Sequence, residues 1–149
     1  MPIFLLTLII ATLVVLTWID IKHHRLPDIL TLPLIAGGLA WAFWSGTIPL
    51  MDSLLGAMIG FLSLYLLGEA FFRLRKIDGL GLGDAKLFAG VGAWLGWQAL
   101  PYVALLAAII SIVWHLTIRI SRKDASPEQP FGPALAIAFI TGLLGWLPI

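Results

Sequence analysis

Long apolar stretches alternate with short polar connections along this sequence. A helix that crosses the hydrocarbon core of a bilayer, about 30 Å thick, needs roughly 20 residues that are mostly apolar. Six stretches approach that length: residues 3–19, 29–44, 50–72, 82–97, 101–118 and 131–147. The pattern therefore predicts an all-α polytopic membrane protein, a compact bundle of six transmembrane helices that forms one domain over residues 1–149.

The polar connections predict how the helices are oriented in the membrane. Residues 20–28, 73–80 and 119–130 form three longer connections, and all nine basic residues lie in or beside them. Because lysine and arginine are enriched in cytoplasmic loops, we expect these connections in the cytoplasm and, with six spans, both termini in the periplasm. Tryptophans at the opposite helix ends fit an interfacial aromatic belt. These are Trp41, Trp44, Trp94, Trp97 and Trp146.

Composition agrees with a lipid-embedded chain and excludes several kinds of chemistry. The sequence is 60% hydrophobic and 11% charged, and its mean hydropathy is +1.03. A net charge of +1 gives no global field that would attract nucleic acid. The absence of cysteine excludes disulfides, thiol catalysis and cysteine-ligated zinc, and we expect no metal and no cofactor. No feature indicates an oligomeric state.

Two aspartates stand out against this apolar background. Asp84 lies within the glycine-rich residues 79–87, directly before an apolar stretch, and Asp20 closes the first apolar stretch. Counting roughly 20 residues from the external end of each helix brings both carboxyl groups to a similar shallow depth on the cytoplasmic side. Because ionisable groups at membrane depth are costly, each is a candidate functional residue. We therefore expect Asp20 and Asp84 to meet, although 64 positions separate them.

A structural explanation competes with the functional one at each aspartate. Asp84 is also a suitable N-cap for the helix that follows, where a carboxylate is favourable. A cap does not explain Asp20, because we expect it at a helix C-terminus, where the helix dipole disfavours negative charge. Asp28 follows Pro27 and opens the second helix, so we interpret it as an N-cap.

Paired carboxyl groups can hydrolyse a peptide bond. When two carboxyl groups lie a few ångströms apart in a poorly solvated site, they share a proton. The ionised group activates a water molecule that attacks the peptide carbonyl, and the protonated group assists the carbonyl oxygen and the leaving amine. The sequence therefore predicts Asp20 and Asp84 as a catalytic pair, and Gly81 and Gly83 as residues that give an extended substrate room beside Asp84.

The residues that carry this prediction resemble the type IV prepilin peptidases, a family of GxGD intramembrane aspartic proteases. The resemblance includes Leu-Pro-Asp after Asp20, Gly-Leu-Gly-Asp at residues 81–84, Gly-Ala-Trp-Leu-Gly-Trp at residues 92–97 and Pro-Phe-Gly-Pro at residues 130–133. It implies that Asp20 and Asp84 are catalytic, that the protein lies in the bacterial inner membrane, and that a prepilin or pseudopilin leader is cut on the cytoplasmic side. Such leaders are basic, and their candidate acidic partners are Asp28, Asp78, Asp124 and Glu128.

The sequence departs from the long form of that family, which carries paired CxxC motifs associated with N-methylation. We therefore expect peptidase activity without methylation of the product. Three other hypotheses remain open. One is a GxGD protease for a different membrane-anchored substrate. Another is a small proton- or cation-coupled transporter in which Asp20 and Asp84 bind the cation. In the third, the protein is inactive and the two aspartates serve only packing.

Overall fold

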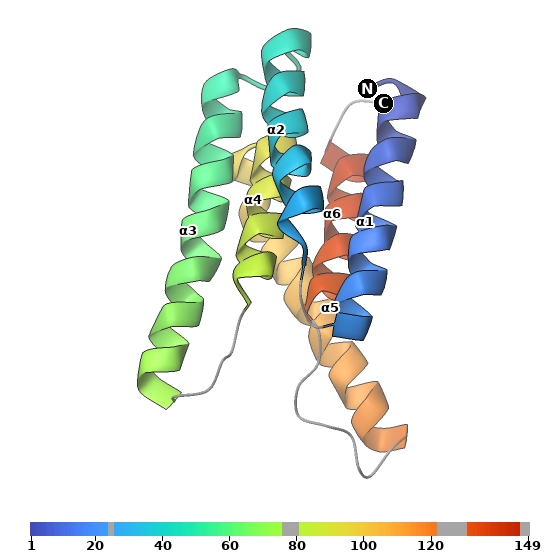
Figure 1. Ribbon diagram of the computed structural model, residues 1–149, viewed down its shortest axis with the longest axis vertical. Coiled ribbons are helices and arrows are strands. Elements are labelled where there is room, and N and C mark those ends of the chain that lie inside the picture. Colours follow the sequence, from blue (N-terminus) through green and yellow to red (C-terminus); the bar gives the residue numbers. More distant parts are fainter. Residues whose placement is uncertain (24–25, 76–80, 122–130, 147–149) are drawn as a thin grey trace.

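The computed structural model describes residues 1–23, 26–75, 81–121 and 131–146, and they form a helical bundle (Figure 1). Six α-helices and one short 3-10 helix are present in these ranges. They are α1 (Ile3–His23), α2 (Asp28–Ser45), α3 (Leu50–Arg75), α4 (Leu82–Leu95), η1 (Trp97–Ala99), α5 (Leu100–Ser121) and α6 (Gly132–Trp146). The six predicted helices are confirmed, and most of their ends lie within a few residues of the predicted positions.

Helix α1 is longer than the apolar stretch that predicts it. Helix α1 continues through Asp20 to His23, so this carboxyl group lies in the last turn of the helix and not at its end. The apolar pattern stops at residue 19, but backbone hydrogen bonding continues through the polar residues that follow. The predicted first stretch therefore ends about one turn short of the helix, and Asp20 lies close to the helix C-terminus, where it was expected.

Four helical segments are long and apolar enough to cross a membrane. They are Ile3–His23, Asp28–Ser45, Leu50–Leu74 and Trp97–Ile118, the last of which joins η1 to α5. Helix α6 is apolar but shorter, and α4 has only 14 residues. At 1.5 Å per residue α4 is about 21 Å long, less than the hydrocarbon core of a bilayer. It ends at Gly96, whose φ of 82° lies in a region that favours glycine.

Helix α4 is the central element of the bundle. Its residues from Leu87 to Leu95 are all buried, and it packs against α3, α2, α6 and α5 (Figure 1). Two hydrogen bonds fix it to its neighbours: the Ser53 hydroxyl donates to the Ala93 carbonyl at 2.5 Å, and the Trp94 indole donates to the Leu34 carbonyl at 2.8 Å. This packing holds the N-terminus of α4, and with it Asp84, in the interior.

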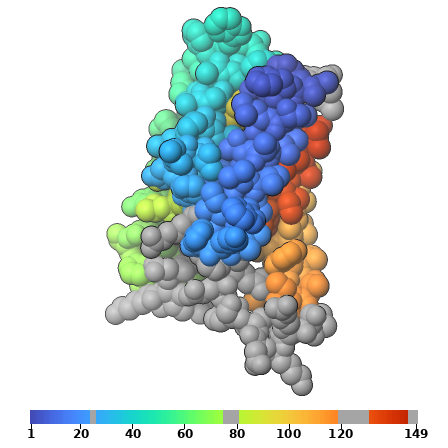
Figure 2. Space-filling view, turned by 45° about the vertical axis from the view of Figure 1, so that its right-hand side comes forward, coloured from blue at the N-terminus to red at the C-terminus, as the bar shows by residue number. Residues whose placement is uncertain are grey.

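Helix α6 lies in contact with α1 and α5 in the other half of the bundle. It packs against both of them and against α4, and its buried Leu135 and Phe139 belong to the same core as Leu13 and Leu16 of α1. In the space-filling view α1 lies between α2 and α6 (Figure 2). The N-terminus of α6 therefore lies near the C-terminal part of α1, which carries Asp20.

Candidate active site

Asp20 and Asp84 line one cavity although they come from different helices. Only 6% of Asp20 and 9% of Asp84 is exposed, and the two groups interact electrostatically. The cavity has a volume of about 240 Å³. It is lined by Asp20, Leu26, Asp28, Gly81, Leu82, Gly83, Asp84 and Lys86. The prediction that the two carboxyl groups meet is confirmed, and their catalytic role stays a prediction.

Asp84 is held by the first turn of α4. The helix begins at Leu82 with Gly81 in the N-cap position, so the alternative that Asp84 is the N-cap is wrong. Asp84 is the third residue of the helix, and its backbone N–H donates to the Gly81 carbonyl at 3.1 Å. The backbone of Gly81 also interacts with the Asp84 carboxyl group. A carboxylate in the first turn suits the helix dipole, which explains how this position tolerates a buried acid.

Asp20 is held by the first residue of α6. The backbone N–H of Gly132, the first residue of α6, donates to Oδ2 of Asp20 at 3.1 Å. The two residues are 112 positions apart, and both are buried. Our sequence interpretation missed this role of Gly132. The signal was present in the Pro-Phe-Gly-Pro motif at residues 130–133, but a sequence does not reveal which buried group such a glycine faces.

The two glycines predicted to contact substrate differ in their surroundings. Both Gly81 and Gly83 line the cavity. A Cβ atom on Gly81 would meet nothing closer than Oδ2 of Asp84 at 3.8 Å, whereas one on Gly83 would lie 2.7 Å from Cβ of Leu26. The small size of Gly83 therefore makes room for Leu26, and contact of either glycine with a substrate stays a prediction.

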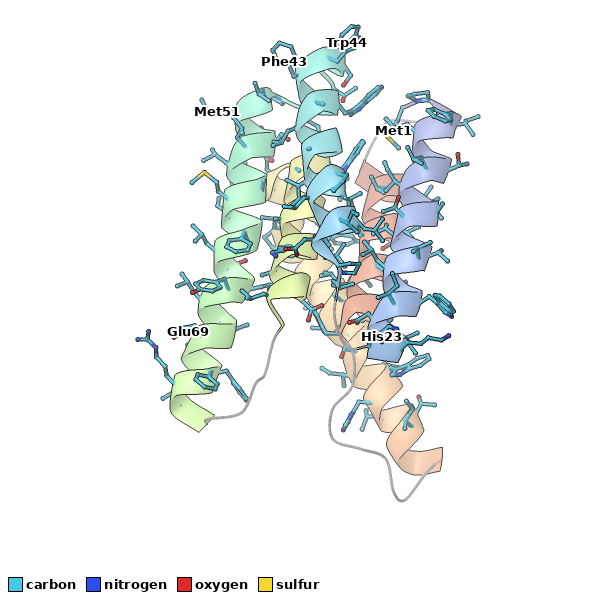
Figure 3. The ribbon with its side chains drawn as sticks, in the orientation of Figure 1. Met1, His23, Phe43, Trp44, Met51 and Glu69 are labelled. Atoms are coloured by element: carbon cyan, nitrogen blue, oxygen red, sulfur yellow. The ribbon has the colours of Figure 1, made fainter. Side chains whose placement is uncertain are left out.

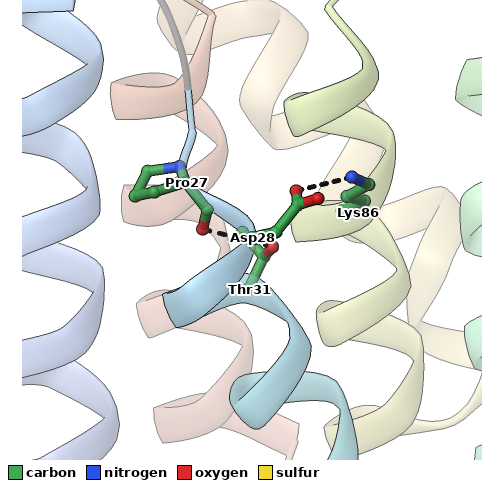
Figure 4. Close-up of polar contacts among 4 residues, drawn as sticks. All are labelled: Pro27, Asp28, Thr31 and Lys86. Atoms are coloured by element: carbon green, nitrogen blue, oxygen red, sulfur yellow. Dashed lines mark hydrogen bonds and ion pairs between the residues drawn. The ribbon is translucent and has the colours of Figure 1, made fainter.

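A third carboxylate of the cavity is paired with a lysine. The Lys86 ammonium group of α4 lies 2.5 Å from Oδ1 of Asp28 (Figure 4). The prediction that Asp28 is an N-cap is wrong, because α2 begins at Asp28 itself and Pro27 occupies the cap position. The Thr31 hydroxyl donates to the Pro27 carbonyl at 3.5 Å within this first turn (Figure 4). The pair links α2 to α4 beside Asp84.

The other acidic residues considered as partners of a basic leader lie outside the described residues. These are Asp78, Asp124 and Glu128. In the described part of the cavity wall, three carboxyl groups face one ammonium group, so the lining is acidic on balance.

Comparison with known proteins shows that this chain is similar to leader peptidases. A model of the "Type IV leader peptidase family" matches residues 7–116. A prepilin leader peptidase/N-methyltransferase of Aeromonas salmonicida (strain A449) is 46% identical over 138 residues, which make up 92% of this chain and 45% of that protein. No solved structure matches the chain.

Two further relatives with the same name agree. The protein of Pectobacterium carotovorum subsp. carotovorum is 46% identical over 138 residues, 92% of this chain and 50% of its own length. The protein of Neisseria gonorrhoeae is 39% identical over 137 residues, 92% of this chain and 45% of its own length. This chain therefore spans about half the length of the curated relatives it matches.

Proposed function

The chain belongs to the type IV leader peptidase family, and from this premise we propose that it is a membrane aspartic endopeptidase that uses Asp20 and Asp84. The observation that carries the proposal is the pair of buried carboxyl groups, from α1 and α4, that line one cavity. The match to the family model includes both aspartates. A cavity between helices gives a peptide segment a route to both groups.

The proposed reaction needs one ionised and one protonated carboxyl group. The ionised carboxylate accepts a proton from water while the water oxygen bonds to the carbonyl carbon of the scissile peptide. The protonated carboxyl group donates a hydrogen bond to the carbonyl oxygen, which gains negative charge. The C–N bond then breaks, and the leaving amine takes a proton from the pair. Because the two groups interact, they titrate as a pair.

The proposed substrate is a prepilin or a type II secretion pseudopilin. The relatives are named for two activities, leader peptidase and N-methyltransferase. Paired carboxyl groups account for peptide hydrolysis, so we assign the peptidase activity to these 149 residues. We propose that these residues alone do not methylate the product, because they include no cysteine.

We further propose that the protein spans the bacterial inner membrane six times, with both termini in the periplasm and the cavity toward the cytoplasm. Met1, Phe43, Trp44 and Met51 gather at one end of the bundle, and His23 and Glu69 lie toward the other (Figure 3). The basic Lys22 at the end of α1 supports a cytoplasmic assignment for the end that carries the aspartates.

Cleavage of a co-expressed, tagged prepilin in bacteria tests the proposal. Wild type is expected to shorten the substrate, and Asp20→Asn and Asp84→Asn are each expected to abolish the size shift at normal membrane levels of enzyme. Asp52→Asn is the matched control, because Asp52, in the first turn of α3, accepts hydrogen bonds from Trp97 and Gln98 of η1 and does not line the cavity. Normal cleavage by either active-site variant would refute the proposed pair.

The transporter hypothesis makes a different prediction. It expects proton or cation flux in vesicles and partial function in Asp20→Glu or Asp84→Glu, since a longer carboxylate can still bind a cation. Flux together with an unprocessed prepilin would favour that hypothesis over the peptidase.

A further inference from the structure

The first residue of α6 meets Asp20 in two ways. Its backbone N–H donates to Oδ2 of Asp20, and its missing side chain leaves the space that the carboxyl group fills. A Cβ atom on Gly132 would collide with Oδ2 and would lie 3.0 Å from Cγ of Asp20. Because Gly132 is not among the glycines with positive φ, space and not backbone conformation requires glycine here.

The local sequence makes Gly132 a donor that needs a partner from elsewhere in the fold. The first amides of an α-helix have no acceptor within the helix. In α6 the next residue, Pro133, has no N–H, and the amide of Leu135 donates to the Phe131 carbonyl at 3.1 Å. A buried Gly132 amide without an acceptor would be costly, so Asp20 satisfies the amide while the amide fixes Asp20.

We propose that Gly132 is a positioning residue for Asp20 in the proposed cleavage reaction, on whose validity this inference rests. The amide holds one carboxyl oxygen of Asp20 in place within the cavity wall that Asp84 shares. The N-terminus of α6 also carries partial positive charge, which stabilises the negative charge that a water-activating carboxylate bears. The first turn of α6 contains no acidic side chain of its own. The positive end of this helix is therefore left to stabilise the carboxylate of Asp20.

A purely structural role for this contact makes different predictions. If Asp20 served only to cap α6, loss of the contact would lower stability and leave the turnover of folded enzyme unchanged. If Gly132 positions Asp20 for catalysis, folded enzyme turns over more slowly and binds its substrate with little change. The split between kcat and KM therefore separates the two roles.

The main test compares three alanine substitutions on α6. Gly132→Ala is expected to lower kcat on the order of 100-fold with a KM close to wild type, the loss expected when a reacting group moves by about 1 Å. In Gly145→Ala the new Cβ meets nothing within 4 Å, so wild-type kinetics are expected. In Gly142→Ala it lies 2.8 Å from Cδ1 of Leu95, which strains packing away from the cavity, and only stability is expected to fall. Kinetics are measured on monodisperse, detergent-purified full chain with a synthetic prepilin.

A spectroscopic readout covers the case in which Gly132→Ala does not fold. In protein labelled on glycine nitrogen, the Gly132 amide resonance is expected to change in Asp20→Ala, because its acceptor is lost, while the Gly145 resonance stays in place. An unchanged Gly132 resonance would overturn the inference, as would a wild-type kcat in Gly132→Ala.

The two proposals fail in distinguishable ways. If Asp20→Asn and Asp84→Asn still cleave prepilin, the proposed function fails and the positioning role with it. If both are inactive while Gly132→Ala turns over like Gly145→Ala, only the positioning role is wrong.

Discussion

Asp20 and Asp84, the buried aspartates in the part of the chain that the structure describes, are each supported by backbone at the start of a helix. Asp84 lies in the first turn of α4 and interacts with Gly81, and Asp20 accepts a hydrogen bond from Gly132 at the start of α6. Helix N-termini stabilise negative charge, so these two contacts offset part of the cost of placing two carboxyl groups in an apolar bundle. Without these contacts, an uncharged side chain would be less costly to bury than a carboxylate at both positions.

The glycines of the Gly-Leu-Gly-Asp stretch are predicted to differ in what they tolerate. In Gly83→Ala the new Cβ would face Cβ of Leu26, which cannot rotate away, so we expect a loss of about 1–3 kcal/mol from overpacking. The gain in helix propensity, about 1 kcal/mol, offsets part of this loss and leaves a net loss of stability of up to about 2 kcal/mol. Gly81→Ala is expected to lower the free energy of unfolding by less than about 1 kcal/mol. Its new Cβ has room, and the loss comes only from alanine being a less favourable N-cap than glycine.

Thermal unfolding of the two purified variants measures this difference. If a substrate backbone passes beside Gly81, Gly81→Ala should also raise KM, while its melting temperature falls less than that of Gly83→Ala. Equal melting temperatures for Gly81→Ala and Gly83→Ala would contradict the packing role of Gly83.

At this scale the sequence indicates the acids but not the groups that hold them. Asp20 and Asp84 could be identified because a carboxyl group beside a long apolar stretch is rare and costly. The contact of Gly132 with Asp20 and the pair of Lys86 with Asp28 join residues 112 and 58 positions apart, and such contacts depend on tertiary packing. The N-cap interpretation of Asp28 failed for a local reason, since α2 begins one residue earlier than expected and Pro27 takes the cap position.

At the scale of elements, the close approach of α3 to α4 determines where Asp84 lies. Gly56 and Gly92 face each other so closely that a Cβ on either would collide with the carbonyl of the other. One turn further along α3, a Cβ on Gly60 would lie 2.6 Å from the Phe88 carbonyl oxygen. Small residues at both helix surfaces allow this approach, as in other membrane bundles. The sequence predicted a compact bundle, but not which helices are in contact.

Substitution at this contact is expected to separate the helices. Gly92→Ala adds a methyl group against the backbone of Gly56, which cannot yield, so we expect a loss of about 1–3 kcal/mol despite better helix propensity. Because α4 carries Asp84, cleavage should fall as well. Gly145→Ala makes the same chemical change in open space and should leave both properties intact. Melting temperature in detergent and prepilin cleavage in membranes are the measurements, and a fully stable, fully active Gly92→Ala would show that the helices adapt.

At the scale of the whole molecule, hydropathy predicted the number of helices but not their arrangement. The six helices could be located because a bilayer demands long apolar stretches. Their positions could not, because lipid-facing and buried helices have similar composition in a membrane protein. Helix α4 is central and only 14 residues long, yet its apolar stretch resembles those of α1 and α5, whose outer surfaces are exposed.

The orientation in the membrane yields the last prediction, and the sequence makes it easy to test. The chain contains no cysteine, so a single introduced thiol is the only site for a maleimide. His23 at the end of α1 and Thr47 between α2 and α3 are both exposed and lie at opposite ends of α2. With the cavity that holds Asp20 and Asp84 toward the cytoplasm, Thr47→Cys should react with a membrane-impermeant maleimide in intact spheroplasts. His23→Cys should react only after the membrane is permeabilised, because basic connections stay in the cytoplasm.

Unmodified wild type controls for background, and retained prepilin cleavage shows that each variant is folded. The reverse labelling pattern would place Asp20 and Asp84 toward the periplasm and would rule out cleavage of a leader on the cytoplasmic side.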